Sequence, residues 1–139
     1  MVEYYSSVNP EILLFTINRK EAITKSRTDI SPETEYLQCA SKSLSKGESF
    51  PPHKHKELRR ESLKTQEAWV FLSGKVKAKF YDVDDTLYFE TYLGTGDCAV
   101  VFNAGHGFEV VEDNTILYEF KIGPYYGIAA DKVPIGDLV

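Results

Sequence analysis

The sequence predicts a single all-β domain, and three observations support this prediction. Short apolar runs of strand length recur along the chain, with turn signals roughly every 8–12 residues. In residues 75–81 (KVKAKFY), lysines and apolar residues alternate, as they do in a half-buried strand. No apolar pattern of helical period extends over an ordinary helix length. The 139 residues fit one domain, and 42% of them are apolar, which is enough for a core. A β-sandwich or β-barrel is therefore expected.

The first part of the chain contains two predicted strands separated by polar segments. Residues 1–10 are polar and rich in tyrosine, and they are expected to form an arm. Residues 12–17 (ILLFTI) form a β-favouring apolar run. After a polar stretch with a Ser-Pro turn signal, residues 35–44 alternate in part and predict a second strand. We therefore expect an irregular N-terminal arm of about residues 1–34, followed by a barrel.

Six further strands are predicted in the second part of the chain. Turn signals of Gly, Asp and Asn separate them. Within the alternating segment, Val76, Ala78 and Phe80 are expected to face the core and the lysines to face water. The predicted strands are residues 67–72, 75–81, 86–93, 98–102, 108–111 and 115–122. The barrel is thus expected over about residues 35–122. The tail of about residues 123–139 is punctuated by Gly and Pro and is expected to be irregular.

Composition and charge exclude several classes of function. The formal net charge of −5 and the pI near 5.2 argue against a nucleic-acid-binding protein. The chain has no apolar run of the roughly 18 residues that a membrane span requires, and its N-terminus does not resemble a signal peptide. Cys39 and Cys98 lie far apart in the sequence and form no CxxC motif. A cytoplasmic protein with two reduced, buried thiols is therefore expected.

The chain's three histidines and one glutamate form a candidate metal site. His53 and His55 would share one face of a strand, because side chains alternate with a period of two. Glu67 would share a face with Trp69, and a buried carboxylate among aromatic residues needs a cation or several donors. His106 lies in a second segment bounded by glycines. Together these side chains provide four ligands for a first-row transition metal, although Glu67 could equally form a salt bridge at a strand edge.

At this point the sequence resembles the cupin superfamily. The resemblance to the first cupin motif lies in Gly47, His53, His55, Glu67 and Gly74. The segment 96–106 is similar to the second motif, and the resemblance as a whole covers about residues 40–122. It implies a cupin-type double-stranded β-helix, or jelly-roll barrel, and a metal bound by His53, His55, Glu67 and His106. The spacer between His55 and Glu67 is longer than in the cupin pattern, so Lys56–Gln66 is interpreted as an inserted loop. Glu61 and Gln66 are then alternative ligands.

Three functions fit these residues, and whether the protein is an enzyme stays open. The first is a small metal-binding cupin that holds Fe, Mn, Ni or Zn and binds or acts on a small polar or anionic metabolite. The second is a sugar-nucleotide isomerase-like or epimerase-like cupin, because residues 53–56 (HKHK) are similar to a segment in which histidines transfer protons without metal. The third is a non-catalytic binding or accessory protein with a structural metal.

The sequence also suggests partners. The inserted loop and its border carry cations that could hold a carboxylate or phosphate group, or could simply be solvated: Lys54, Lys56, Arg59, Arg60 and Lys64. Ala68, Val70 and Leu72 lie on the face opposite Glu67. That face could be buried in a homodimer, since cupins often dimerise through their sheets, or it could be covered by residues 12–17. We expect a small-molecule ligand and a homodimer, and neither a nucleic-acid nor a membrane partner.

Overall fold

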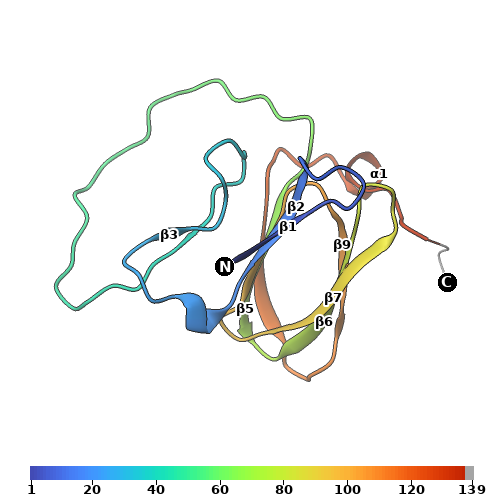
Figure 1. Ribbon diagram of the computed structural model, residues 1–139. Coiled ribbons are helices and arrows are strands. Elements are labelled where there is room, and N and C mark those ends of the chain that lie inside the picture. The colour runs from blue at the N-terminus through green and yellow to red at the C-terminus, as the bar shows by residue number, and fades with distance from the viewer. Residues whose placement is uncertain (137–139) are drawn as a thin grey trace.

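Two antiparallel β-sheets pack face to face in the computed structural model, which describes residues 1–136 (Figure 1). The larger sheet has five strands in the order β1-β2-β8-β5-β10. These strands are β1 (Val2–Tyr5), β2 (Leu13–Asn18), β8 (Cys98–Val101), β5 (Glu67–Ser73) and β10 (Ile116–Lys121). The smaller sheet has the order β7-β6-β9. Its strands are β7 (Leu87–Gly94), β6 (Lys75–Tyr81) and β9 (Gly105–Val110).

The remaining regular elements are short. Strands β3 (Thr28–Asp29) and β4 (Ala40–Ser41) pair with each other beside the larger sheet. A 3₁₀ helix, η1 (Lys20–Ala22), follows β2, and one α-helical turn, α1 (Ile128–Asp131), lies in the tail. The all-β prediction is therefore confirmed. Among residues 1–136 the two main sheets stay separate and do not close into one hydrogen-bonded barrel, so the architecture is that of a β-sandwich. No helix in this part of the chain is long and apolar enough to cross a membrane.

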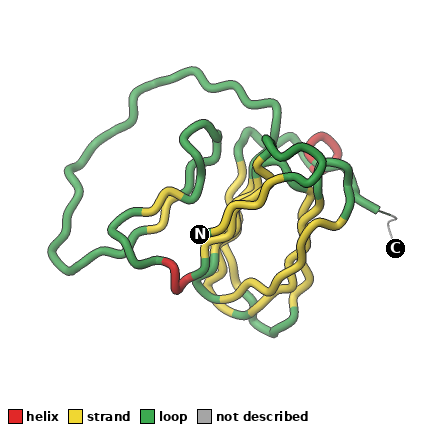
Figure 2. Tube along the Cα trace, viewed as in Figure 1, coloured by secondary structure: helices red, strands yellow, loops and turns green. Residues whose placement is uncertain are grey.

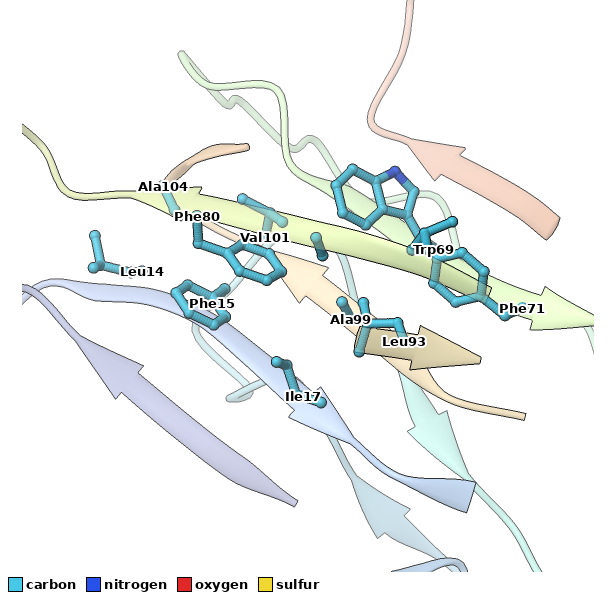
Figure 3. Close-up of a cluster of buried hydrophobic side chains, with 12 residues drawn as sticks. Leu14, Phe15, Ile17, Trp69, Phe71, Phe80, Leu93, Ala99, Val101 and Ala104 are labelled. Carbon is cyan, nitrogen blue, oxygen red and sulfur yellow. The ribbon is translucent and has the colours of Figure 1, made fainter. Parts of the chain in front are cut away.

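The core lies between the facing sides of the two sheets (Figure 3). Strand β6 alternates as predicted, with Val76, Ala78 and Phe80 fully buried and its lysines directed outward. Phe80 stacks on Phe15 of the larger sheet, with ring centroids 4.0 Å apart. Each aromatic side chain buried in this way contributes about 2–3 kcal/mol to stability through the hydrophobic effect. The core therefore fixes the positions of β5, β6 and β9, which carry the candidate site.

Part of the outer face of the larger sheet is covered by residues 19–41, here called the covering segment. Ala68 of β5 and Val100 of β8 pack there against Ile30 of the covering segment, in a second apolar cluster. Gln66 anchors the segment, because its Oε1 accepts a hydrogen bond of 2.8 Å from the Leu37 backbone N–H. On the face opposite Glu67, Ala68 is thus buried by the chain itself and Val70 packs against the same cluster, whereas Leu72 stays 46% exposed. One expectation was that residues 12–17 would cover this face. They instead form a strand of the same sheet, beside β8.

The strand predicted at residues 12–17 is confirmed as β2, but the arm expected at residues 1–10 was wrong, because residues 2–5 form strand β1. Strand β1 pairs with β2, and β2 pairs with β8, so both belong to the larger sheet. All six residues of β2 are buried. Strand β1 pairs through its backbone, which a polar, tyrosine-rich sequence does not reveal.

Two local predictions were also wrong. Of residues 35–44, only Ala40–Ser41 form a strand, because the preceding residues turn. The turn is closed by the Gln38 side chain, whose Nε2 donates to the carbonyl oxygen of Pro32 at 2.8 Å. The tight bend expected at residues 104–107 is absent, since β9 begins at Gly105 and pairs with β6 from there onward.

The inserted loop is longer and more exposed than expected. Every residue from 42 to 65 is exposed, and this stretch is called the exposed loop below. Residues 48–66 contain neither helix nor strand. Figure 1 and Figure 2 show this stretch arching away from the sandwich before it returns to β5. Two consecutive prolines, Pro51 and Pro52, lack the N–H groups that a strand ladder requires. His53 and His55 are therefore not on a strand.

Candidate functional site

A cavity of about 630 Å³ opens between the two sheets. Its walls come from β5 and β10 on one side, from β6 and β9 on the other, and from the tail residues 128–135. The polar groups that line it include Glu67, Tyr81, His106, Glu119 and Lys132. This volume lies within the range of roughly 300–1,000 Å³ that is typical of small-molecule sites.

Glu67 is the most deeply buried charged group in the cavity wall, with 4% of its surface exposed. The Trp69 indole Nε1–H donates to its Oε1 at 2.6 Å. Lys121 Nζ lies 3.3 Å from its Oε2, and His106 Nε2 lies 3.5 Å from the same oxygen. Burial alone would raise the pKa of Glu67, but the interaction with His106 and the Trp69 N–H outweigh burial and lower the pKa to about 2. Glu67 is thus a carboxylate at neutral pH.

The backbone places these groups beside one another. Glu67 and Trp69 share the inner face of β5, as the alternation predicted, and Lys121 is the direct partner of Glu67 on β10. Side chains of directly paired residues lie close enough to interact. His106 comes from the other sheet, where it pairs with Phe80. The site therefore exists only when the two sheets are packed together.

The orientation of the His106 ring leaves its Nε2 facing Glu67. Its Nδ1 lies 3.1 Å from the Ala104 carbonyl oxygen. A carbonyl oxygen only accepts, so Nδ1 carries a proton and Nε2 is free to protonate or to bind a metal. This use of one ring nitrogen to orient the other is typical of metal-bound histidines. If Nε2 is unprotonated, its lone pair faces a carboxylate oxygen, and a cation beside them, such as the Lys121 ammonium group or a metal ion, offsets the repulsion.

The separation of these two atoms fits a shared metal ion. At 3.5 Å, Nε2 and Oε2 are farther apart than in an ordinary N–H···O hydrogen bond. In a tetrahedral site with ligand bonds of about 2.1 Å, neighbouring ligand atoms are about 3.4 Å apart. The Glu67 and His106 side chains thus fit two adjacent ligand positions, and no backbone movement is required.

The structure places the other predicted ligands elsewhere. His53 and His55 lie near each other in the exposed loop, with ring centroids 5.4 Å apart, and neither lines the cavity. Within residues 1–136 no group of three or more His, Cys, Asp or Glu side chains could hold a metal ion. The four predicted ligands therefore form two separate pairs in this conformation.

The two alternative ligands also lie away from the cavity. Glu61 is exposed in the loop and pairs with Arg59. Gln66 is buried, but its side chain binds the covering segment on the opposite face of the sheet from Glu67. Of the three glutamate or glutamine candidates, Glu67 alone lines the cavity.

The tail closes one side of the cavity. Asp131 accepts a hydrogen bond of 2.7 Å from the Thr65 hydroxyl group, which joins α1 to the end of the exposed loop. Ile135 packs against Gly105 so closely that a β-carbon there would lie 2.1 Å from its Cδ1 atom. The tail was expected to be irregular over about residues 123–139. Of this range, residues 137–139 lie outside the described residues, and the rest is irregular apart from α1. Its position as a cavity wall was not predicted.

Lys121 was also missed at the sequence level. A signal for it exists in the alternation of β10, where Leu117, Glu119 and Lys121 share one face. That signal becomes specific only once the register of β10 against β5 is known.

No known protein family, curated protein or solved structure matches this chain.

Proposed function

We propose that the protein is a small metal-binding protein of cupin type whose cavity binds a small polar or anionic metabolite. The observation that carries the proposal is the pairing of Glu67 Oε2 with His106 Nε2 at 3.5 Å in a cavity wall. Both atoms can bind a divalent transition metal, and their separation suits one. The sandwich of antiparallel sheets is compatible with a jelly-roll topology, which is the finer fold that we propose.

The chemistry of the cavity supports a polar ligand. Aromatic and aliphatic groups such as Trp69 and Ile135 give apolar surface, while Tyr81 and Lys132 give polar contacts. A mainly apolar wall with a few convergent polar groups is characteristic of metabolite sites. The ammonium group of Lys132 offers a charge partner to a carboxylate or phosphate group on the ligand.

We propose further that the exposed loop completes the metal site. When extended, the chain between His55 and Glu67 can span up to about 40 Å, so its length allows both loop histidines to reach the cavity. The loop ends at Thr65, which already lines the cavity. In this proposal Glu67 and His106 hold Fe, Mn, Ni or Zn first, and His53 and His55 fold over it. Such a metal would act as a Lewis acid towards an oxygen atom of the bound ligand.

Metal analysis of purified variants tests this proposal. After reconstitution, elemental mass spectrometry should find about one metal ion per wild-type chain and almost none in Glu67→Gln or His106→Ala. His53→Ala/His55→Ala should bind metal more weakly than the wild type but better than either cavity variant, because it keeps the pair Glu67 and His106 that already lie side by side. Glu109→Gln is the matched control, since Glu109 is an exposed carboxylate on β9. A wild-type chain that binds no metal would refute the proposal.

Lys121 favours a second candidate, a metal-free acid–base site. Its ammonium group already lies beside Glu67 and compensates the buried charge without a metal. In that case His106 would transfer protons to and from a ligand, as in the isomerase-like alternative, because an imidazole nitrogen can both accept and donate a proton. A thermal-shift screen of nucleotide sugars with excess chelator separates the two candidates. Stabilisation by a nucleotide sugar under these conditions favours the metal-free site, and its absence counts against it.

The remaining expectations from the sequence are part of the proposal. They are a homodimer, a cytoplasmic location, and either a catalytic or an accessory role for the metal. The exposed loop has five cations and two carboxylates between residues 49 and 65. It is a candidate for contact with an anionic ligand once it folds towards the cavity.

A further inference from the structure

Cys39 and Cys98 lie side by side, although they are remote in the sequence. Their Sγ atoms are 3.9 Å apart, and both thiols are free. Cys98 lies on β8 and belongs to the apolar cluster on the outer face of the larger sheet. Cys39 lies in the covering segment and packs against that cluster. The proximity is independent of the cavity, which opens on the other face.

Both backbones are fixed by hydrogen bonds, so the proximity is built into the fold. The Cys39 N–H donates to Ser31 Oγ at 3.0 Å, and its carbonyl oxygen accepts from the Ile30 N–H at 2.8 Å. Cys98 pairs with Asn18 on one side and Val70 on the other, in the middle of the larger sheet. Formation of an S–S bond of about 2.05 Å therefore requires an approach of about 2 Å.

The two thiols differ in accessibility and acidity. Cys98 is 7% exposed, whereas Cys39 is only partly buried. The hydrogen bond with Cys98 lowers the pKa of Cys39, although burial opposes this. The same hydrogen bond, together with burial, raises the pKa of Cys98. A partly exposed cysteine of lowered pKa is the better nucleophile, and a neighbouring thiol can resolve the product.

We propose that Cys39 and Cys98 form a reversible intramolecular disulfide that ties the covering segment to β8. The oxidant is a low-molecular-weight disulfide such as oxidised glutathione. The Cys39 thiolate attacks one of its sulfur atoms, and the first glutathione leaves as a thiol. Cys98 then gives up its proton and attacks Cys39 Sγ, and the second glutathione leaves. The protein loses two protons and two electrons, and the glutathione disulfide gains them.

The disulfide would reinforce a segment that is already attached at both ends. At its start, Asp97 accepts hydrogen bonds from the Arg19 side chain at 2.8 Å and from the Lys20 backbone N–H at 3.1 Å. Near its end, Gln66 holds Leu37. A bond between Cys39 and Cys98 would stop the end nearer the exposed loop from detaching. Oxidation would thus restrict the segment that leads into the loop carrying His53 and His55.

The exposed loop allows a direct test. Trypsin should cut the folded protein first between Lys54 and Lys64, because this stretch is exposed and rich in Lys and Arg. These cuts lie between the two cysteines. After treatment with oxidised glutathione, the two fragments should run together on a non-reducing denaturing gel and separate after reduction. Intact mass should show the loss of two hydrogen atoms and no retained glutathione.

The matched controls are Cys39→Ser and Cys98→Ser, in which the fragments should separate with or without reductant. Cys98→Ser places a hydroxyl group in an apolar cluster and can fail to fold, so Cys39→Ser is the primary control. In the wild type, oxidation should also raise the midpoint of thermal unfolding by about 10 °C, because the bond closes a long loop in the unfolded chain. Fragments that separate after oxidation of the wild type, a stable glutathione adduct, or a disulfide-linked dimer would overturn the proposal.

Discussion

Glu67 and His106 face each other across the cavity wall, with Oε2 and Nε2 3.5 Å apart, although they belong to different sheets. Each is positioned by a second interaction. Glu67 accepts the Trp69 N–H on its other oxygen, and the His106 ring is oriented by the Ala104 carbonyl oxygen. This arrangement makes the stability of the fold and the acidity of Glu67 depend on the same few side chains.

Stability should fall in acid because Glu67 must protonate. Its pKa is lowered to about 2 in the folded state from an ordinary value of 4.5. A lowered pKa stabilises the folded state fully above about pH 4.5, and the contribution is lost as the pH falls towards 2. We expect Glu67→Gln to lose up to about 3 kcal/mol of unfolding free energy at neutral pH. Urea unfolding across this pH range measures the effect.

The variant and the wild type should converge in acid, since both then lack the charge. Glu109→Gln, an exposed control on β9 of the other sheet, should change the unfolding free energy by less than about 0.5 kcal/mol. A constant difference between Glu67→Gln and the wild type from neutral to acid pH would show that the charge of Glu67 does not matter.

Trp69→Phe should weaken the fold mainly through Glu67. The change keeps most of the aromatic packing but removes the N–H donor that lies 2.6 Å from Oε1. A hydrogen bond to a buried charge contributes about 1.5–3 kcal/mol. Trp69 is the chain's only tryptophan, so circular dichroism should follow the unfolding. The loss of unfolding free energy caused by Trp69→Phe should be smaller when Glu67 is already replaced by Gln. An equal loss with and without Glu67→Gln would contradict the coupling between Trp69 and Glu67.

Gly105→Ala should displace the tail from the cavity. A β-carbon at Gly105 would lie 2.1 Å from Ile135 Cδ1, so Ile135 must move. We expect faster amide hydrogen exchange in residues 128–135 and a modest fall in the melting temperature, because the flexible end of Ile135 can shift but Tyr81 Cβ, 3.1 Å from the new β-carbon, must also give way slightly. Gly107→Ala is the matched control on the same strand, since nothing lies within 4 Å of its β-carbon. Identical exchange in the two variants would refute the tail's role as a wall.

Asp82→Asn should detach the N-terminal strand. Asp82 is buried, and its Oδ2 accepts from the Ser7 N–H at 2.8 Å and from the Ser7 hydroxyl group at 2.7 Å. Burial alone would raise the pKa of Asp82, but the hydrogen bonds that it accepts from Ser6, Ser7 and the Val83 N–H outweigh burial and hold this pKa well below its usual range. The NH2 group of an asparagine side chain is a donor, and it would face the N–H and hydroxyl donors of Ser7. We therefore expect the unfolding free energy to fall by about 2–4 kcal/mol.

Hydrogen exchange should locate this effect in β1, which Ser7 follows in the chain. Asp113→Asn, in an exposed turn, is the control and should leave stability nearly unchanged. Protection of β1 that is equal in the two variants would show that Asp82 does not anchor it.

The predictions from sequence succeeded where local alternation decides the structure. Alternation in residues 75–81 gave β6 and its buried face, and the shared parity of Glu67 and Trp69 placed both in the interior. Prediction from local alternation failed for β1, because this strand has no apolar face of its own and depends on backbone pairing with β2. It also failed at residues 104–107, where the glycines suggested a bend but cross-strand pairing with β6 extends the strand.

The candidate site shows the same limit. Sequence patterns brought Glu67 and His106 into one hypothesis, and the structure places them together. The pairing of Cys39 with Cys98, and of Lys121 with Glu67, depends on which distant segments pack together. No local pattern carries that information. The loop histidines lie apart from Glu67 here, and their role as ligands stays a prediction.

Metal content tests the central claim most directly. The wild-type chain, reconstituted and analysed by elemental mass spectrometry, should hold about one transition-metal ion, and His106→Ala should hold less than about a tenth of that. Loss of metal from His106→Ala while Glu109→Gln keeps it would assign the metal to the cavity between the sheets. A wild-type chain without metal, or a His106→Ala chain that keeps it, would contradict the account.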